Sequence, residues 1–217
     1  MTSIEPSTLP QKALLPHPTP ELVKLAKELF VVQGRVTEVA IQKLLTAFPA
    51  NTVTAEILLK VVVINQIYST GILAVQPVAE RIQAAKIDAA LKAGDPGVVH
   101  LIDRLQFVTA KGKEVDRSIY SFATKYCALH QPQHYPIYDG LISQKLQAYL
   151  KQDGFSTTPF KDAELRNYEN FKAVVLQFRE HYHLTKFSLR EIDQFLWILG
   201  KGLLSPLPSP GIHLRHP

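Results

Sequence analysis

The spacing of apolar residues between Pro20 and Leu204 constrains the fold most, because it follows a helical repeat in nearly every segment. Apolar residues three and four positions apart share one face of a helix, whereas a half-buried strand alternates with period two. This pattern predicts helices over residues 20–34, 36–48, 54–68, 78–94, 96–105, 119–127, 139–150, 165–178 and 188–200. We therefore expect an all-α, multi-helix body.

One segment is ambiguous. Val61, Val62 and Val63 are β-branched and favour a strand. The length of the apolar stretch from Thr54 to Tyr68, and its end at Gly71, favour a buried helix instead. No neighbouring segment resembles a partner strand, so we predict a helix.

Proline positions divide the chain. Nine of the fifteen prolines lie at the ends, at positions 6, 10, 16, 18, 20, 206, 208, 210 and 217. This distribution predicts an extended N-terminal arm over residues 1–19 and a proline-rich tail over 205–217. Between them we expect one globular body over 20–204, which can divide into lobes at 20–110 and 111–204.

Cysteine and charge content exclude several classes of protein. Cys127 is the single cysteine, so an internal disulfide, a zinc ribbon and a four-cysteine iron–sulfur site are excluded. The first twenty residues hold five prolines and no apolar core of a signal peptide, so we expect a cytoplasmic protein without a membrane segment. The net charge of +5 permits a polyanionic partner without requiring one.

The usual catalytic and cofactor motifs are absent. The sequence contains no GxxxxGK[ST], no GxGxxG and no GxSxG. His130 and His134 have the spacing of a metal pair, but Pro132 between them interrupts the helix that would aim both at one ion. Cys127 lies on an apolar helical face, which predicts a buried, unreactive thiol. We expect neither a metal nor a cofactor.

One segment, residues 111–150, concentrates basic and aromatic side chains. The backbone N–H groups at a helix start favour an anion, and basic and hydroxyl residues surround the start of the helix predicted near Ile119. Aromatic rings nearby can stack on a base. The candidate DNA-binding residues are Lys111, Lys113, Arg117, Ser118, Ser121 and Lys125, and the candidate base-pocket residues are Tyr135, Tyr138 and Trp197.

Asp139 follows Pro136 and precedes an apolar-periodic run. Its ordinary role would be that of an N-cap, worth about 1 kcal/mol to its helix. A carboxylate held at a helix start beside basic residues can also stabilise a cation that develops on a sugar. The two roles are compatible, and Asp139 is the candidate catalytic residue.

The order of helix, short loop, Ile137-Tyr138-Asp139-Gly140-Leu141 and new helix resembles the helix-hairpin-helix DNA glycosylases of base excision repair. The resemblance implies a two-lobed all-α fold, duplex DNA as partner, a base flipped into a pocket, and Asp139 as the catalytic acid. It covers thirty to forty residues of the chain. Trp197 has a competing role in helix packing, because Phe195, Leu196, Ile198 and Leu199 surround it.

This sequence also departs from the family pattern. The family hairpin contains Gly-x-Gly, whereas the nearest glycine before Ser121 is Gly112. Members with lyase activity carry a lysine where this chain has Ser121, so the resemblance implies a monofunctional N-glycosylase without lyase activity. Lys125 lies one helical turn further along the same face.

Two other functions remain open. A non-catalytic helical module that binds DNA or another protein would explain the absent glycines and lysine. Alternatively, the basic segment is an ordinary solvated surface and Asp139 is only a cap.

Overall fold

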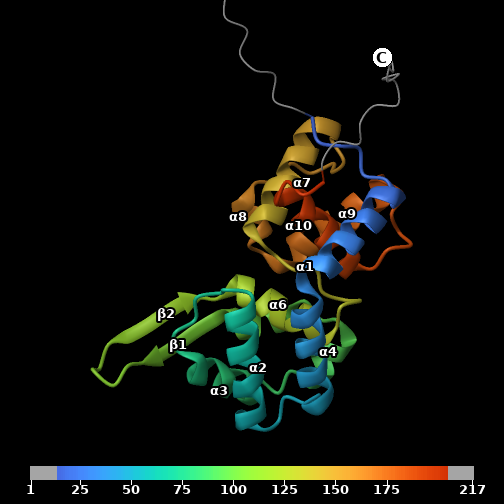
Figure 1. Ribbon diagram of the computed structural model, residues 1–217. Helices are drawn as coiled ribbons and strands as arrows, with labels where there is room; N and C mark the ends of the chain where they lie inside the picture. Colours follow the sequence, from blue (N-terminus) through green and yellow to red (C-terminus); the bar gives the residue numbers. More distant parts are fainter. Residues whose placement is uncertain (1–13, 205–217) are drawn as a thin grey trace, which may run out of the picture.

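The computed structural model describes residues 14–204. Within them the fold is all-α apart from one small hairpin, and the helices form two groups joined by the long helix α1 (Pro20–Ala47) (Figure 1). We call the first group the hairpin lobe: α2 (Thr54–Ile67), α3 (Val75–Ala85), α4 (Asp88–Ala93), α5 (Gly97–Asp103), β1 (Arg104–Val108), β2 (Glu114–Ser118) and α6 (Tyr120–His130). The C-terminal lobe contains α7 (Gly140–Asp153), α8 (Asp162–Leu165), α9 (Tyr168–His181) and α10 (Leu189–Gly200).

Helix α1 runs along both lobes, its first half beside α10 and its second half beside α2 (Figure 1). The Thr19 hydroxyl caps its start by accepting a hydrogen bond from the N–H of Leu22. The predicted break at Gly34 was wrong, because the helix continues through this residue to Ala47. One interior glycine costs about 1 kcal/mol, which the packing of residues such as Ile41 outweighs.

The valine-rich segment is helix α2, as predicted, and it buries Ile57, Val61 and Ile64. Lys60 is also fully buried on this helix. Its ammonium group donates to the carbonyl oxygens of Phe48 and Ala50 and to Asn51 Oδ1, at 3.1, 2.8 and 2.7 Å. These bonds fasten the connection between α1 and α2, and burial lowers the pKa of Lys60 to about 8.

The helix predicted over 78–94 is two helices, α3 and α4. Lys86 adopts a left-handed conformation with φ of 49° and ends α3. Helix α4 then begins at Asp88, whose carboxylate accepts bonds from the backbone and side-chain amide groups of Asn51. Apolar periodicity continues across the break, which is why the sequence pattern did not reveal it.

The antiparallel hairpin of β1 and β2 is the largest departure from the prediction. The helix expected over 96–105 ends at Asp103, and Leu105 then pairs with Arg117 and Phe107 with Val115. Gly112 forms the turn with φ of +73°. The local signal was the alternation of Arg104, Leu105, Gln106 and Phe107, which a helical interpretation of so short a segment overlooks.

The later helices begin close to where their caps predict. Asp139 caps α7 through the N–H of Leu141, and Ser188 and Glu191 form the predicted capping box of α10. The helix predicted over 165–178 is α9, which begins three residues later than predicted because Asn167 caps it, and the short helix α8 ends at Leu165.

The lobe boundary differs from residue 110. Helix α6 packs on α5 within the hairpin lobe, so the division falls in the loop between α6 and α7. Of the predicted N-terminal arm, residues 14–19 are described and form no helix or strand, and the Pro16 carbonyl oxygen accepts a bond from the Tyr149 hydroxyl. Residues 1–13 and the predicted tail 205–217 lie outside the described residues.

Candidate active site

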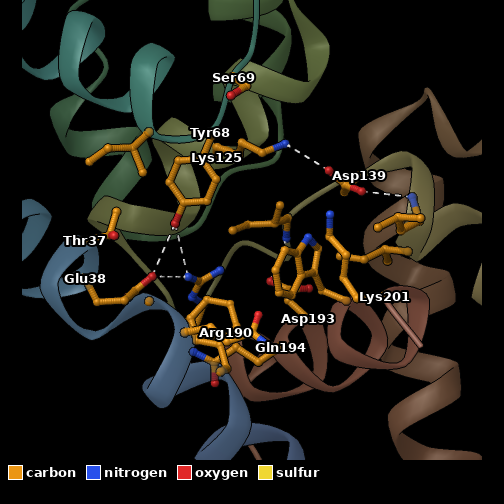
Figure 2. A pocket seen from close by; sticks show the side chains of 18 residues that line it. Thr37, Glu38, Tyr68, Ser69, Lys125, Asp139, Arg190, Asp193, Gln194 and Lys201 are labelled. Atoms are coloured by element: carbon orange, nitrogen blue, oxygen red, sulfur yellow. Dashed lines mark hydrogen bonds and ion pairs between the residues drawn. The ribbon is translucent and has the colours of Figure 1, made fainter. Parts of the chain in front are cut away.

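A cavity of about 480 Å³ lies between the two lobes, a size that suits a small ligand (Figure 2). Helices α1, α2, α6 and α10 and the loop before α7 all contribute to its wall. Apolar and aromatic walls come from residues such as Phe30, Tyr68 and Trp197. The acidic and basic residues lining the cavity are Glu38, Lys125, Asp139, Arg190, Asp193 and Lys201.

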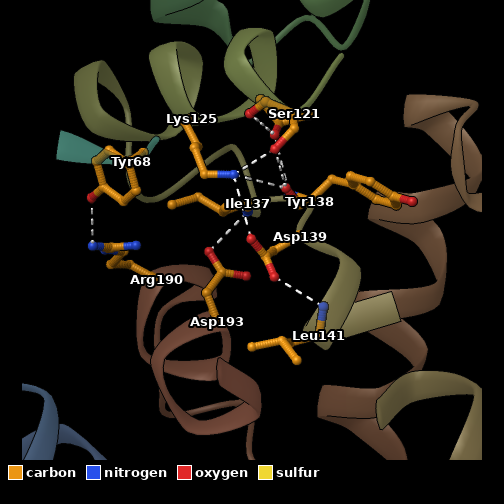
Figure 3. A network of polar contacts seen from close by, with 10 residues as sticks. Tyr68, Ser121, Lys125, Ile137, Tyr138, Asp139, Leu141, Arg190 and Asp193 are labelled. Carbon is orange, nitrogen blue, oxygen red and sulfur yellow. Dashed lines mark hydrogen bonds and ion pairs between the residues drawn. The ribbon is translucent and has the colours of Figure 1, made fainter. Parts of the chain in front are cut away.

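Lys125 reaches this cavity from α6, and its side chain is only 5% exposed (Figure 3). Its ammonium nitrogen lies 2.5 Å from Ser121 Oγ, 3.3 Å from the Tyr138 carbonyl oxygen and 3.7 Å from Asp139 Oδ2. The Ser121 contact joins two residues one helical turn apart, as their spacing predicts. Burial lowers the pKa of Lys125, although Asp139 opposes that shift.

Asp139 combines the two roles that the sequence offered. Oδ1 accepts the capping bond from the N–H of Leu141 at 2.9 Å, and Oδ2 faces the amine of Lys125 (Figure 3). The backbone beside it is also held, because the N–H of Tyr138 donates to Thr124 Oγ1 at 3.1 Å. The carboxylate is 30% exposed, so it is in contact with both the buried amine and solvent.

Asp193 is a second carboxyl group at the cavity, on α10. It is 2% exposed, and Oδ2 accepts a bond from the N–H of Ile137 at 2.8 Å. Oδ1 is buried and has no hydrogen-bond partner among the described residues. Burial raises the pKa of Asp193 to about 8, against the opposing effects of Arg190, the Ile137 N–H and Lys125.

Arg190 lies three residues before Asp193 on α10 and connects the lobes. It donates to Glu38 on α1 at 2.7 Å and to the Tyr68 hydroxyl at the end of α2 at 3.2 Å. The guanidinium carbon also lies 5.2 Å from the centre of the Phe30 ring. Arg190 is thus held in place from three directions.

A second hollow of about 300 Å³ lies at the start of α6 and contacts the same segment that carries Asp139. Arg117, Ser118 and Ser121, three of the predicted DNA-binding residues, line it. Arg166, which the sequence reasoning missed, supplies a further cation.

The remaining predicted DNA-binding residues lie elsewhere. Lys111 and Lys113 lie at the exposed tip of the hairpin, apart from the start of α6 where we expected them. Lys125 is buried and lines the cavity, so it is not available as a surface cation. Local charge patterning cannot distinguish a surface lysine from a buried one.

The three predicted base-pocket residues are separated. Trp197 lines the cavity, with its ring 5.7 Å from that of Phe30. Tyr138 lines the second hollow and donates to Asp162 at 2.6 Å. Tyr135 is a core residue that lines neither space, since it is fully buried and donates to the Asp95 carbonyl oxygen at 2.9 Å.

Sequence reasoning missed Tyr68, Arg190, Asp193 and Gln194, which lie on α10 or at the end of α2. One signal could have identified Asp193. It lies four residues after Leu189 and three before Leu196, on the inner face of an otherwise apolar stripe. A carboxyl group at such a position requires a special environment.

Cys127 is fully buried, as predicted. Among residues 14–204, no set of three or more histidine, cysteine, aspartate or glutamate side chains is arranged to hold a metal ion. No helix in the described part of the chain is long and apolar enough to cross a membrane.

Comparisons with known proteins identify a family. A model described as an N-terminal domain and named HI_0787_N matches residues 22–134, just over half of the 217 residues. A Haemophilus influenzae (strain KW20 / Rd) protein named "Uncharacterized protein" is 43% identical over 140 residues, which are 64% of this chain and 63% of that relative. The chain thus aligns with less than two thirds of the relative's length. No solved structure matches. Because the family model covers more than half of the sequence, the chain belongs to the HI_0787_N family.

Proposed function

We propose that the protein binds duplex DNA and hydrolyses the N-glycosidic bond of a damaged base held in the interlobe cavity. The observation that supports this most strongly is the buried amine of Lys125, which lies 3.7 Å from the partly exposed carboxylate of Asp139 at a cavity with an aromatic wall. An enzyme that acts on a base must take it out of the stack into such a pocket.

Asp139 would stabilise positive charge on the sugar as the bond breaks. Water then forms a bond to C1′, while the electron pair of the C1′–N bond leaves with the base, which takes up a proton. Asp139 is suited to this step because it lines the cavity and its Oδ1 is fixed by the N–H of Leu141, while Oδ2 faces the amine of Lys125.

Lys125 favours a second chemical route. The resemblance implied no lyase activity because Ser121 occupies the lysine position, but Lys125 lies beside Asp139 and burial lowers its pKa. An uncharged amine can attack C1′ in place of water and form an imine with the opened sugar. The two routes give different products, so one assay distinguishes them.

The second hollow would hold phosphate. Arg117 and Arg166 supply cations there, and Ser118 and Ser121 supply hydroxyl donors. The segment carrying Asp139 lies between this hollow and the cavity. One nucleotide would then place its phosphate in the hollow and its base in the cavity. We also propose a cytoplasmic location, in keeping with the single buried cysteine.

The test is a panel of duplex oligonucleotides with different damaged bases, incubated with the wild type, Asp139→Asn and Lys125→Met. We expect the wild type to leave abasic sites on at least one lesion. Asp139→Asn keeps the capping oxygen, so it should bind DNA and lose base release by about a hundredfold or more.

Borohydride distinguishes the two routes because it reduces the imine of the amine route to a stable protein–DNA adduct, whereas the water route forms no imine. A trapped protein–DNA adduct that Lys125→Met abolishes supports the amine route, and abasic sites without an adduct support water. DNA binding that weakens with salt but never leads to base release would favour the non-catalytic module. Absence of binding would exclude both DNA functions.

A further inference from the structure

We propose that Asp193 determines which ligands the cavity accepts, by donating a hydrogen bond from Oδ1 to an uncharged ring nitrogen or carbonyl oxygen of a heterocyclic base. This inference rests on the proposed function, because it names the class of base that the site would take. It begins from Oδ1, which lies in a residue of the cavity wall and has no partner among residues 14–204.

Of the three carboxyl groups that line the cavity, Glu38 and Asp139 each form an ion pair and Asp193 does not. Lys125 forms an ion pair with Asp139, and Arg190 forms one with Glu38. Both cations thus have an anionic partner in direct contact, whereas Asp193 has only the backbone N–H of Ile137. A buried carboxyl group without a charged partner is stable only when it carries a proton.

The groups facing Asp193 act in opposite directions. Arg190 on α10, Lys125 on α6 and the N–H of Ile137 each favour the carboxylate, but burial outweighs them and raises the pKa to about 8. Other polar groups nearby are Asp139 at the start of α7, Glu38 and the Tyr68 hydroxyl around Arg190, Gln194 and Lys201 in the cavity wall, and the buried Tyr168 hydroxyl. Asp193 is therefore mostly protonated at neutral pH.

Hydrogen bonding decides which oxygen carries the proton. Oδ2 already accepts from the N–H of Ile137, so it must keep a lone pair in that direction. The proton then belongs on Oδ1, which becomes a donor without an acceptor. A ligand completes this bond only if it presents an acceptor atom, and the rings of Trp197 and Phe30, which pack edge to face in the cavity wall, favour an aromatic ligand.

The experiment is calorimetric titration of the full chain with adenine, which stays uncharged from about pH 6 to about pH 9 and offers ring-nitrogen acceptors. Indole is the control ligand because it has a similar ring surface without such an acceptor. We expect adenine affinity to fall about tenfold between pH 6 and pH 9, as Asp193 loses its proton. Indole affinity should stay constant.

Two variants isolate the carboxyl group. In Asp193→Asn the amide oxygen must accept from Ile137, so the NH₂ group replaces the Oδ1 donor at every pH. This variant should bind adenine with an affinity independent of pH. Asp193→Leu should lose adenine binding, and continued binding of indole would show that its cavity is intact.

Several results would overturn the proposal: adenine affinity that is constant or rises with pH, a pH dependence that persists in Asp193→Asn, or failure of the wild type to bind adenine. Base excision is a separate measurement. Adenine binding with the expected pH dependence but no excision would support Asp193 as the recognition residue and reject the enzyme. Excision without adenine binding would support the enzyme and reject Asp193 as the recognition residue.

Discussion

At the level of single residues, the buried carboxyl group of Asp193 makes the stability of the protein depend on pH. Its carboxyl group is 2% exposed and receives one backbone hydrogen bond. The folded protein binds a proton there up to about pH 8, whereas the unfolded chain releases it near pH 4. The contribution of this group to stability is therefore complete below about pH 4 and is lost as pH rises through about 8.

Replacing Asp193 with asparagine should consequently stabilise the protein at neutral and alkaline pH. We expect a gain on the order of 5 kcal/mol at pH 8, which disappears toward pH 4. Thermal unfolding of the wild type and Asp193→Asn at several pH values measures this difference. A difference that does not change with pH would mean that Asp193 does not titrate in this range.

At the level of elements, helices α1 and α10 each contain a glycine, but the space around the two glycines differs. Gly34 lies inside α1, and a Cβ atom there would be 3.8 Å from Phe30 Cε1, an ordinary contact. Gly200 ends α10, where a Cβ atom would lie 2.9 Å from Leu141 Cβ at the start of α7. Replacement of glycine with alanine should therefore change the free energy of unfolding in opposite directions at the two positions.

We expect Gly34→Ala to raise the free energy of unfolding by about 0.5–1 kcal/mol, since alanine restricts the unfolded chain and favours the helix. Gly200→Ala should lower it by about 1–3 kcal/mol, because α7 and α10 must move apart. Urea denaturation of both variants tests this pair. Destabilisation by Gly34→Ala would indicate that α1 needs a glycine for a bend or a close contact.

At the level of the whole molecule, side chains that lie far apart in the sequence form the contact between the lobes. Glu38 and Tyr68 come from α1 and the end of α2, and Arg190 comes from α10 in the other lobe. Arg190 is mostly buried, with 15% of its side chain exposed. Removing the charge of Glu38 leaves this guanidinium group with a neutral partner.

Glu38→Gln should therefore destabilise the protein by about 1–3 kcal/mol. The matched control is Glu28→Gln, an exposed glutamate of the same helix, for which we expect a change within about 0.5 kcal/mol. Urea denaturation measures both. Equal effects of the two substitutions would show that the bridge between the lobes contributes nothing specific.

Local sequence patterns were enough to predict the helical character of the chain, the caps of α7 and α10, the burial of Cys127 and the shared face of Ser121 and Lys125. These features depend on residues within a few positions of one another, where periodicity and capping chemistry act. The tertiary structure decided the continuity of α1 through Gly34, the pairing of β1 with β2 and the lobe boundary. It also decided which polar groups meet: Lys125 becomes a desolvated partner of Asp139, and Asp193 and Arg190 join them from a helix more than fifty residues later in the chain. Burial and long-range contact set the charge of such groups, and neither can be read from local sequence.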